Sequence, residues 1–264
     1  MATLAGRVPA GRYGFWHVAR MEWIKLRSLR STWWTLVITV AGAIGVGVAV
    51  GINTRNAAGD LTNNALAGII PALLLTSVLG VLTMTSEYSS GMIRSTLAAA
   101  PRRPLLLAAK AAVFGTLALV VGEAASFIAF FAGGAALRHG IAAPTLGEPE
   151  VLRAVLLSGT SFCLIGLLGL GIGAIVRHSG AAIAVVVGGL YVVPAAVGGL
   201  SHPAAAYLPI FIIGNSLSTT KPDACGPGGP CPHFLPAWAG LGVLALYPVV
   251  ALGIGGWLLV RRDA

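Results

Sequence analysis

Long apolar runs alternate with short polar segments along most of the chain. A helix rises about 1.5 Å per residue, so roughly 20 apolar residues cross the hydrocarbon layer of a bilayer. The third run is longer than one crossing needs, and Lys110 near its start indicates that its first turns project from the bilayer. We predict an all-α membrane protein, a bundle of about six transmembrane helices at residues 33–52, 66–85, 105–137, 151–176, 181–200 and 237–260.

The composition supports a membrane protein and excludes a soluble domain. Of the 264 residues, 56% are hydrophobic and 9% are charged, whereas soluble domains carry about 25% charged residues. The net charge of +9 raises the question of nucleic acid. The basic residues lie at the ends of apolar runs and not along one helical face, so we expect no nucleic-acid partner.

The distribution of Lys and Arg predicts the orientation. All of the 17 lysines and arginines except Arg55, Arg138, Arg153 and Lys221 fall on one side of the predicted spans. Since basic residues accumulate on the cytoplasmic side, both termini are predicted to be cytoplasmic. We expect a multi-pass protein of the cell membrane with a cytoplasmic segment at 1–32 and one membrane domain at 33–264.

The segment before the first span predicts an amphipathic helix in the membrane interface. Tryptophan favours the headgroup level, and basic side chains favour anionic lipid. Glu22 and Arg30 interrupt the apolar face. That face consists of Phe15, Trp16, Ala19, Trp23, Leu26 and Leu29.

The segment between the second and third spans, residues 87–104, is longer than a helix connection requires. It predicts a short helix at about 89–99, stopped before Pro101 and followed by a basic pair. Two interpretations stay open: a docking site for another protein, or a basic loop that only fixes orientation.

Three stretches carry a family resemblance: residues 22–28 (Glu-Trp-Ile-Lys-Leu-Arg-Ser), 30–34 (Arg-Ser-Thr-Trp-Trp), and 87–103. Together with the number and order of spans, they resemble the permease subunits of type-2 ATP-binding-cassette exporters. The resemblance implies a six-helix subunit with an N-terminal elbow helix, working as a homodimer or with a related permease. It also implies a separate cytoplasmic ATP-binding subunit as partner.

In this family the first cytoplasmic loop resembles a coupling helix that contacts the ATPase. The resemblance implies that Gly91 permits a close backbone approach and that charged positions pair with the partner. The matching positions in this sequence are Glu87, Gly91, Arg94 and Pro101, with Arg102 and Arg103 as the basic pair.

Other residues within and between the spans invite functional interpretations. Glu123 lies inside the third run, where a carboxyl group either contacts a cationic substrate, relays a proton, or pairs structurally with a hydroxyl or backbone group. Pro194 in the fifth run marks a hinge or a packed kink. The pairs Gly47 with Gly51 and Gly169 with Gly173 permit close helix contact, within the chain or across a dimer.

Cys225 and Cys231 flank a Pro- and Gly-rich loop on the predicted outer side, where we favour a disulfide over free thiols. With His233 they fall short of a tetrahedral metal site, so we expect no metal. A nearby apolar stretch at 204–213 is too short to span and is predicted to be interfacial or re-entrant.

The sequence contains no Gly-rich phosphate loop with its Lys, so ATP hydrolysis is expected on a partner subunit, and we assign no catalytic residue and no cofactor. The rival functions are a self-sufficient ion-coupled transporter, using Glu123 and Pro194, and a non-transporting membrane scaffold. The spans hold too few polar residues to identify a substrate.

Overall fold

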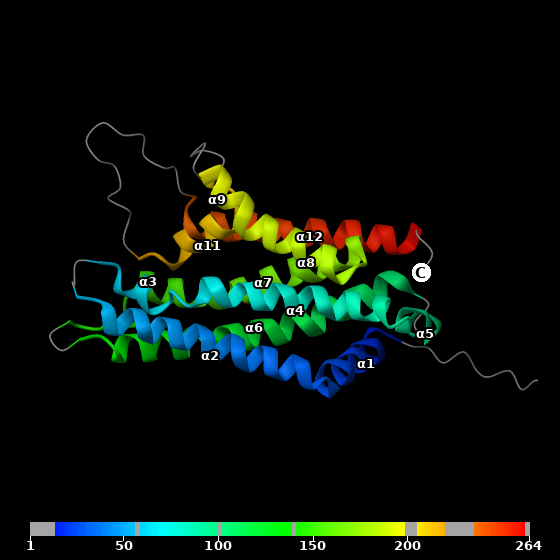
Figure 1. The fold of residues 1–264 in the computed structure, drawn as a ribbon, viewed down its shortest axis with the longest axis horizontal. Coiled ribbons are helices and arrows are strands. Elements are labelled where there is room, and N and C mark those ends of the chain that lie inside the picture. The colour runs from blue at the N-terminus through cyan, green and yellow to red at the C-terminus, as the bar shows by residue number, and fades with distance from the viewer. Residues whose placement is uncertain are drawn as a thin grey trace, which may run out of the picture.

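The structure is a computed structural model that describes residues 14–55, 59–99, 102–138, 141–198, 205–219 and 235–261. The described residues contain helices and no strand (Figure 1). In chain order the elements are α1 (Phe15–Ser28), α2 (Arg30–Asn53), α3 (Leu61–Ala65), α4 (Ile69–Ser89), α5 (Met92–Ala99), α6 (Arg103–Ala135), α7 (Pro149–Val176), α8 (Ser179–Val187), the π-helical turn η1 (Gly188–Val192), α9 (Val193–Gly198), α11 (Pro209–Leu217) and α12 (Ala237–Arg261).

Six helical segments are long and apolar enough to cross a membrane. They are α2, α4, α6, α7, the continuous segment Ser179–Val197 and α12. Each coincides with one of the six predicted spans, although the ends shift by a few residues. The protein is therefore an all-α, multi-pass membrane protein, as the apolar runs predicted.

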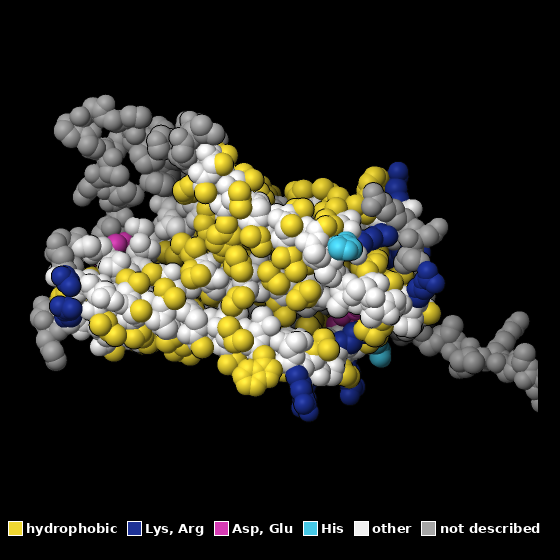
Figure 2. Space-filling view, in the orientation of Figure 1, with side chains coloured by type: hydrophobic (Ala, Val, Ile, Leu, Met, Phe, Trp, Pro, Cys, Tyr) yellow, Lys and Arg dark blue, Asp and Glu magenta, His cyan; other side chains and the backbone are white. Residues whose placement is uncertain are grey.

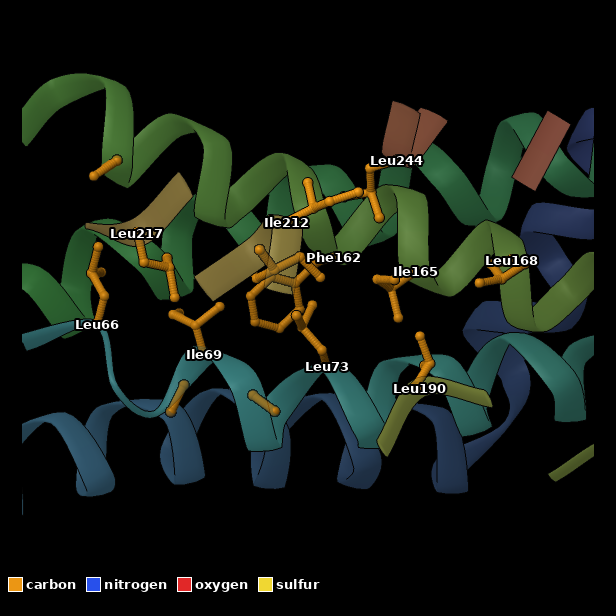
Figure 3. Packing of buried hydrophobic residues seen from close by; sticks show 14 of the residues in the cluster. Leu66, Ile69, Leu73, Phe162, Ile165, Leu168, Leu190, Ile212, Leu217 and Leu244 are labelled. Atoms are coloured by element: carbon orange, nitrogen blue, oxygen red, sulfur yellow. The ribbon is translucent and has the colours of Figure 1, made fainter. Parts of the chain in front are cut away.

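The central helix is α7, which packs against α4, α6 and α12. Figure 3 shows Phe162 and Ile165 of α7 beside Ile69 and Leu73 of α4 in the apolar core. All four side chains are buried. The first span, α2, packs instead against α6 and α4, so it is held to α7 through these two helices.

Close helix contacts in the bundle depend on glycine. A Cβ added at Gly169 would collide with the backbone oxygen of Ser77, and one at Gly47 would collide with that of Ala65. Gly51 and Gly173 also lie against neighbouring helices of the same chain. Both glycine pairs noted in the sequence therefore serve packing within the chain.

The two ends of the bundle differ in charge. One end, here called the basic end, holds α1, α5, the first turns of α2 and α6, and the last turns of α4, α7 and α12 (Figure 1). Lys and Arg gather there more than at the opposite end (Figure 2). Among the described residues, the basic end carries Arg20, Lys25, Arg27, Arg30, Arg94, Arg102, Arg103, Lys110, Arg177 and Arg261, and the opposite end carries Arg55, Arg138 and Arg153.

The structure specifies the helices formed around Pro194 and in the apolar stretch at 204–213. Pro194 follows the π-helical turn, so the fifth span changes helix type just before the proline. The apolar stretch at 204–213 contributes to α11, whose Ile212 and Ile213 are buried. This short helix packs against α7 and α12.

Candidate functional site

The short helix α5 lies at the basic end between α4 and α6. Gly91 separates α4 from α5 with φ 70°, a left-handed conformation that glycine adopts readily. Within α5, Ile93 and Thr96 are buried, whereas Met92 and Arg94 are exposed. One face of α5 thus packs on the bundle, and the other is exposed.

Next to α5, four ionisable side chains form a charge cluster in which Glu22, Glu87 and Lys110 are buried and Lys25 is partly exposed. The Lys110 Nζ lies 2.5 Å from Glu22 Oε2 and 2.7 Å from Glu87 Oε1. The Lys25 Nζ lies 2.9 Å from Glu22 Oε1 and 3.0 Å from Glu87 Oε1. Two lysines and two glutamates together make an electrically neutral group.

The charge cluster joins four helices. Glu22 and Lys25 come from α1, Glu87 from the last turns of α4, and Lys110 from α6. The Lys25 ammonium also donates to Thr96 Oγ1 of α5, at 3.2 Å. A displacement of α5 is therefore opposed by contacts that reach α1, α4 and α6.

The two glutamates of the charge cluster favour the charged form of Lys25. Glu22, Glu87 and Lys110 are each at most 4% exposed, and burial of unpaired charges would be costly. Burial lowers the pKa of Lys25, but the hydrogen bonds and charges of Glu22 and Glu87 outweigh it and raise this pKa above its ordinary value. The stabilisation from charged Lys25 is thus present at neutral pH and is lost only as the pH rises through that raised pKa.

Two arginines hold the last turn of α12 at the basic end. Arg103 Nη1 donates to the Leu259 carbonyl at 2.8 Å, and Arg177 Nη2 donates to the Leu258 carbonyl at 3.0 Å. The last carbonyl groups of a helix lack partners within it and carry partial negative charge, so guanidinium donors stabilise this end. The Arg177 guanidinium also lies over the Tyr88 ring.

The structure shows how the chain itself holds two of the predicted coupling residues, Glu87 and Gly91. Glu87 is buried and paired with lysines of the same chain, so its carboxylate does not face a partner. Gly91 has a positive φ and open space around its Cα within the described chain, so the turn itself favours glycine, and the predicted close approach of a partner stays a prediction.

The other predicted site residues differ in exposure, and some lie outside the described residues. Arg94 and Arg102 are exposed, and Arg103 is bonded to α12. Pro101, Cys225 and Cys231 lie outside the described residues. No group of side chains that could hold a metal occurs in the part of the chain that the structure describes.

Glu123 lies on α6 against a niche of small residues on α7. Its Oε1 accepts a hydrogen bond from the Thr160 hydroxyl at 3.2 Å. A Cβ at Gly159 would collide with the Glu123 carboxyl group, so the glycine makes room for it. Its Oε2 is buried with no hydrogen-bond partner among the described residues. This geometry agrees with one of the three interpretations of Glu123, structural pairing with a hydroxyl. The second carboxylate oxygen is left for a proton or a ligand.

A Glu123→Gln variant tests the structural role of Glu123. Glutamine keeps the size of the side chain and an acceptor for Thr160, so we expect the free energy of unfolding to change by less than about 0.5 kcal/mol. Thr160→Val, which removes the donor, should cost about 1 kcal/mol. Thermal unfolding in detergent measures both. A much larger loss for Glu123→Gln would show that the fold requires the carboxylate itself.

Sequence reasoning missed the ion pair between Glu22 and Lys110. Glu22 was treated as an interruption of an apolar face, and Lys110 as a residue in projecting turns. Each was a charge where an apolar side chain was expected, which signals a buried partner. The signal does not say which charges meet, because the pair is separated by 88 positions.

Comparison of the sequence with known proteins finds no match to a family model and none to a curated protein. The six apolar helices and the construction of the basic end are therefore the observations on which a function can be proposed.

Proposed function

We propose that the chain is the membrane-spanning permease subunit of an ATP-binding-cassette exporter of type 2. Two copies, or one copy and a related permease, enclose the translocation path. A separate cytoplasmic subunit binds and hydrolyses ATP and docks on α5. In this proposal the basic end faces the cytoplasm, in agreement with the enrichment of Lys and Arg there.

The observation that carries the proposal is the way α5 is held. Its outer face exposes Met92 and Arg94, an apolar and a basic side chain suited to a protein partner. Its inner face is anchored through Ile93 and through Thr96, which binds Lys25. An exposed helix fixed to a charge cluster that joins three other helices is suited to receive a force.

The contacts between α5 and the charge cluster support a mechanism for coupling ATP binding to the membrane spans. Closure of the ATPase subunits on ATP pushes α5, and the charge cluster transmits the displacement to α1, α4 and α6. Because α4 and α6 both pack on α7, the movement of these spans opens or closes the path between the two permeases. ATP binding thereby biases the membrane domain toward one of two arrangements.

Charge reversal on α5 tests the docking site. We expect Arg94→Glu to reduce recovery of the ATPase subunit at least about tenfold in affinity purification from native membranes, since like or mismatched charges at an interface are costly. Recovery is measured by mass spectrometry and by ATPase activity of the eluate. Arg27→Glu, an exposed reversal on α1 at the same end, is the matched control and should leave recovery unchanged.

The same purification separates the proposal from its rivals. Equal ATPase recovery with Arg94→Glu and Arg27→Glu would contradict docking on α5. A homo-oligomer without any ATPase would favour the ion-coupled transporter, for which the π-helical turn Gly188–Val192 in a span is the supporting observation. Transport driven by an ion gradient alone would then confirm that alternative.

A further inference from the structure

A groove of about 570 Å³ runs between the outer face of α1 and α6 near the basic end. Its α1 wall includes Phe15, Trp16 and Trp23, and its α6 wall includes Thr116 and Val120. The volume lies in the range of ligand-binding pockets, and the walls are almost wholly apolar. Since Trp16 is 81% exposed and Val120 is 62% exposed, the described residues do not cover this apolar surface.

The groove carries one charged side chain, that of Arg20. The Thr116 hydroxyl donates to the Ala112 carbonyl at 2.8 Å, so its hydrogen-bond donor is already used within α6. Arg20 is exposed, and no acidic side chain of the described residues pairs with it. The described acids at the basic end, Glu22 and Glu87, are both bound to lysines in the charge cluster. The Arg20 guanidinium is therefore open to an anionic group from outside the described residues.

The groove is placed to receive a lipid. From Ala112 to Val120 it follows α6 for about 12 Å, toward the middle of the span. Tryptophans favour the headgroup level, and two of them line the α1 wall beside Arg20. A ligand with a negative head at Arg20 and an apolar tail along α6 would match both parts of the groove.

We propose that this groove binds one anionic phospholipid, with its phosphate on the Arg20 guanidinium and an acyl chain along the outer face of α6. The apolar walls accept the chain, and the guanidinium forms charge-assisted hydrogen bonds with the phosphate. The site does not depend on the proposed transport function. A bound lipid would fix the outer face of α1, whose inner face supplies Glu22 to the charge cluster.

The competing occupant is a second copy of the chain. A symmetric contact centred on this groove would bring two α1 helices together. Exposed Arg20 would then lie near its own counterpart, and juxtaposed like charges are unfavourable. Charge complementarity thus favours the anionic lipid.

The test is titration of the purified chain in neutral detergent with phosphatidylglycerol or phosphatidylcholine, followed by thermal unfolding and native mass spectrometry. Wild type should prefer phosphatidylglycerol. Arg20→Gln should bind it about fivefold more weakly, the effect of one basic residue at an anionic headgroup. Ala112→Trp, which fills the groove from an exposed position, should weaken binding of both lipids. Arg27→Gln, the same charge change elsewhere on α1, should behave as wild type.

Two results would overturn the proposal. One is equal phosphatidylglycerol binding by Arg20→Gln and Arg27→Gln together with unchanged binding by Ala112→Trp. The other is a lipid-free dimer captured by a photo-cross-linker at Thr116, which would assign the groove to a second copy.

Discussion

A Lys110→Met variant is expected to lose about 3–5 kcal/mol of unfolding free energy, the usual cost of removing one partner from a buried ion pair. Lys110 is the cation nearest to both carboxylates of the charge cluster. Without it, both buried carboxylates, Glu22 and Glu87, keep only Lys25 as a paired cation. Denaturant titration in mixed detergent micelles measures the loss.

Two control variants distinguish the loss of the buried ion pair from the loss of a single positive charge. Arg27→Met removes a positive charge from an exposed position and should cost less than about 0.5 kcal/mol. The double variant Glu22→Gln with Lys110→Met restores neutrality and should recover part of the loss, so the effects of the two changes are not additive. A Lys110→Met protein as stable as Arg27→Met would contradict the charge cluster as a structural link.

Gly169→Ala is expected to destabilise the contact between α4 and α7 by about 2–3 kcal/mol. The added methyl group collides with the backbone oxygen of Ser77, which cannot rotate away as a side chain would. The two helices must separate, and overpacking of this kind typically costs 1–3 kcal/mol. The effect is measured as a lower midpoint of thermal unfolding and a smaller monodisperse fraction.

Gly253→Ala is the matched control for this variant. Gly253 is also in a span, in α12, and has open space around its Cα. Alanine is the better helix former, so Gly253→Ala should be neutral or slightly stabilising. If both alanine variants were equally stable, the close approach of α4 to α7 would be contradicted.

The sequence allowed prediction of the parts of the fold that depend on length and composition. Each apolar run formed a helix because a membrane span must satisfy its backbone hydrogen bonds internally. The gathering of basic residues at one end followed from counting Lys and Arg between runs. A short helix between the second and third spans was also predicted, and α5 lies at Met92–Ala99.

The contacts between distant residues could not be predicted from the sequence. Glu22 looked like a defect in an apolar face because its partner, Lys110, lies on another helix. The hydrogen bond from Arg103 to Leu259 at the end of the last helix was likewise not foreseen. Both contacts escaped prediction for the same physical reason: a charge finds its partner in three dimensions, and sequence spacing carries that information only within a helix.

The arrangement of α1 connects the two proposals. Its inner face places Glu22 and Lys25 in the charge cluster, and its outer face presents Arg20 and Trp16 to the lipid groove. In the two proposals, α1 contacts the charge cluster on one face and a lipid on the other. Transport would then be sensitive to anionic phospholipid.

A photo-cross-linking amino acid at position 94, introduced in native membranes, tests most directly whether α5 receives an ATPase. We predict a covalent adduct with a nucleotide-binding protein, at a yield that changes on addition of ATP, and no such adduct from position 145 at the opposite end of the bundle. An adduct formed only from position 145, or none from position 94 in membranes where the chain is active, would contradict the docking of an ATPase on α5.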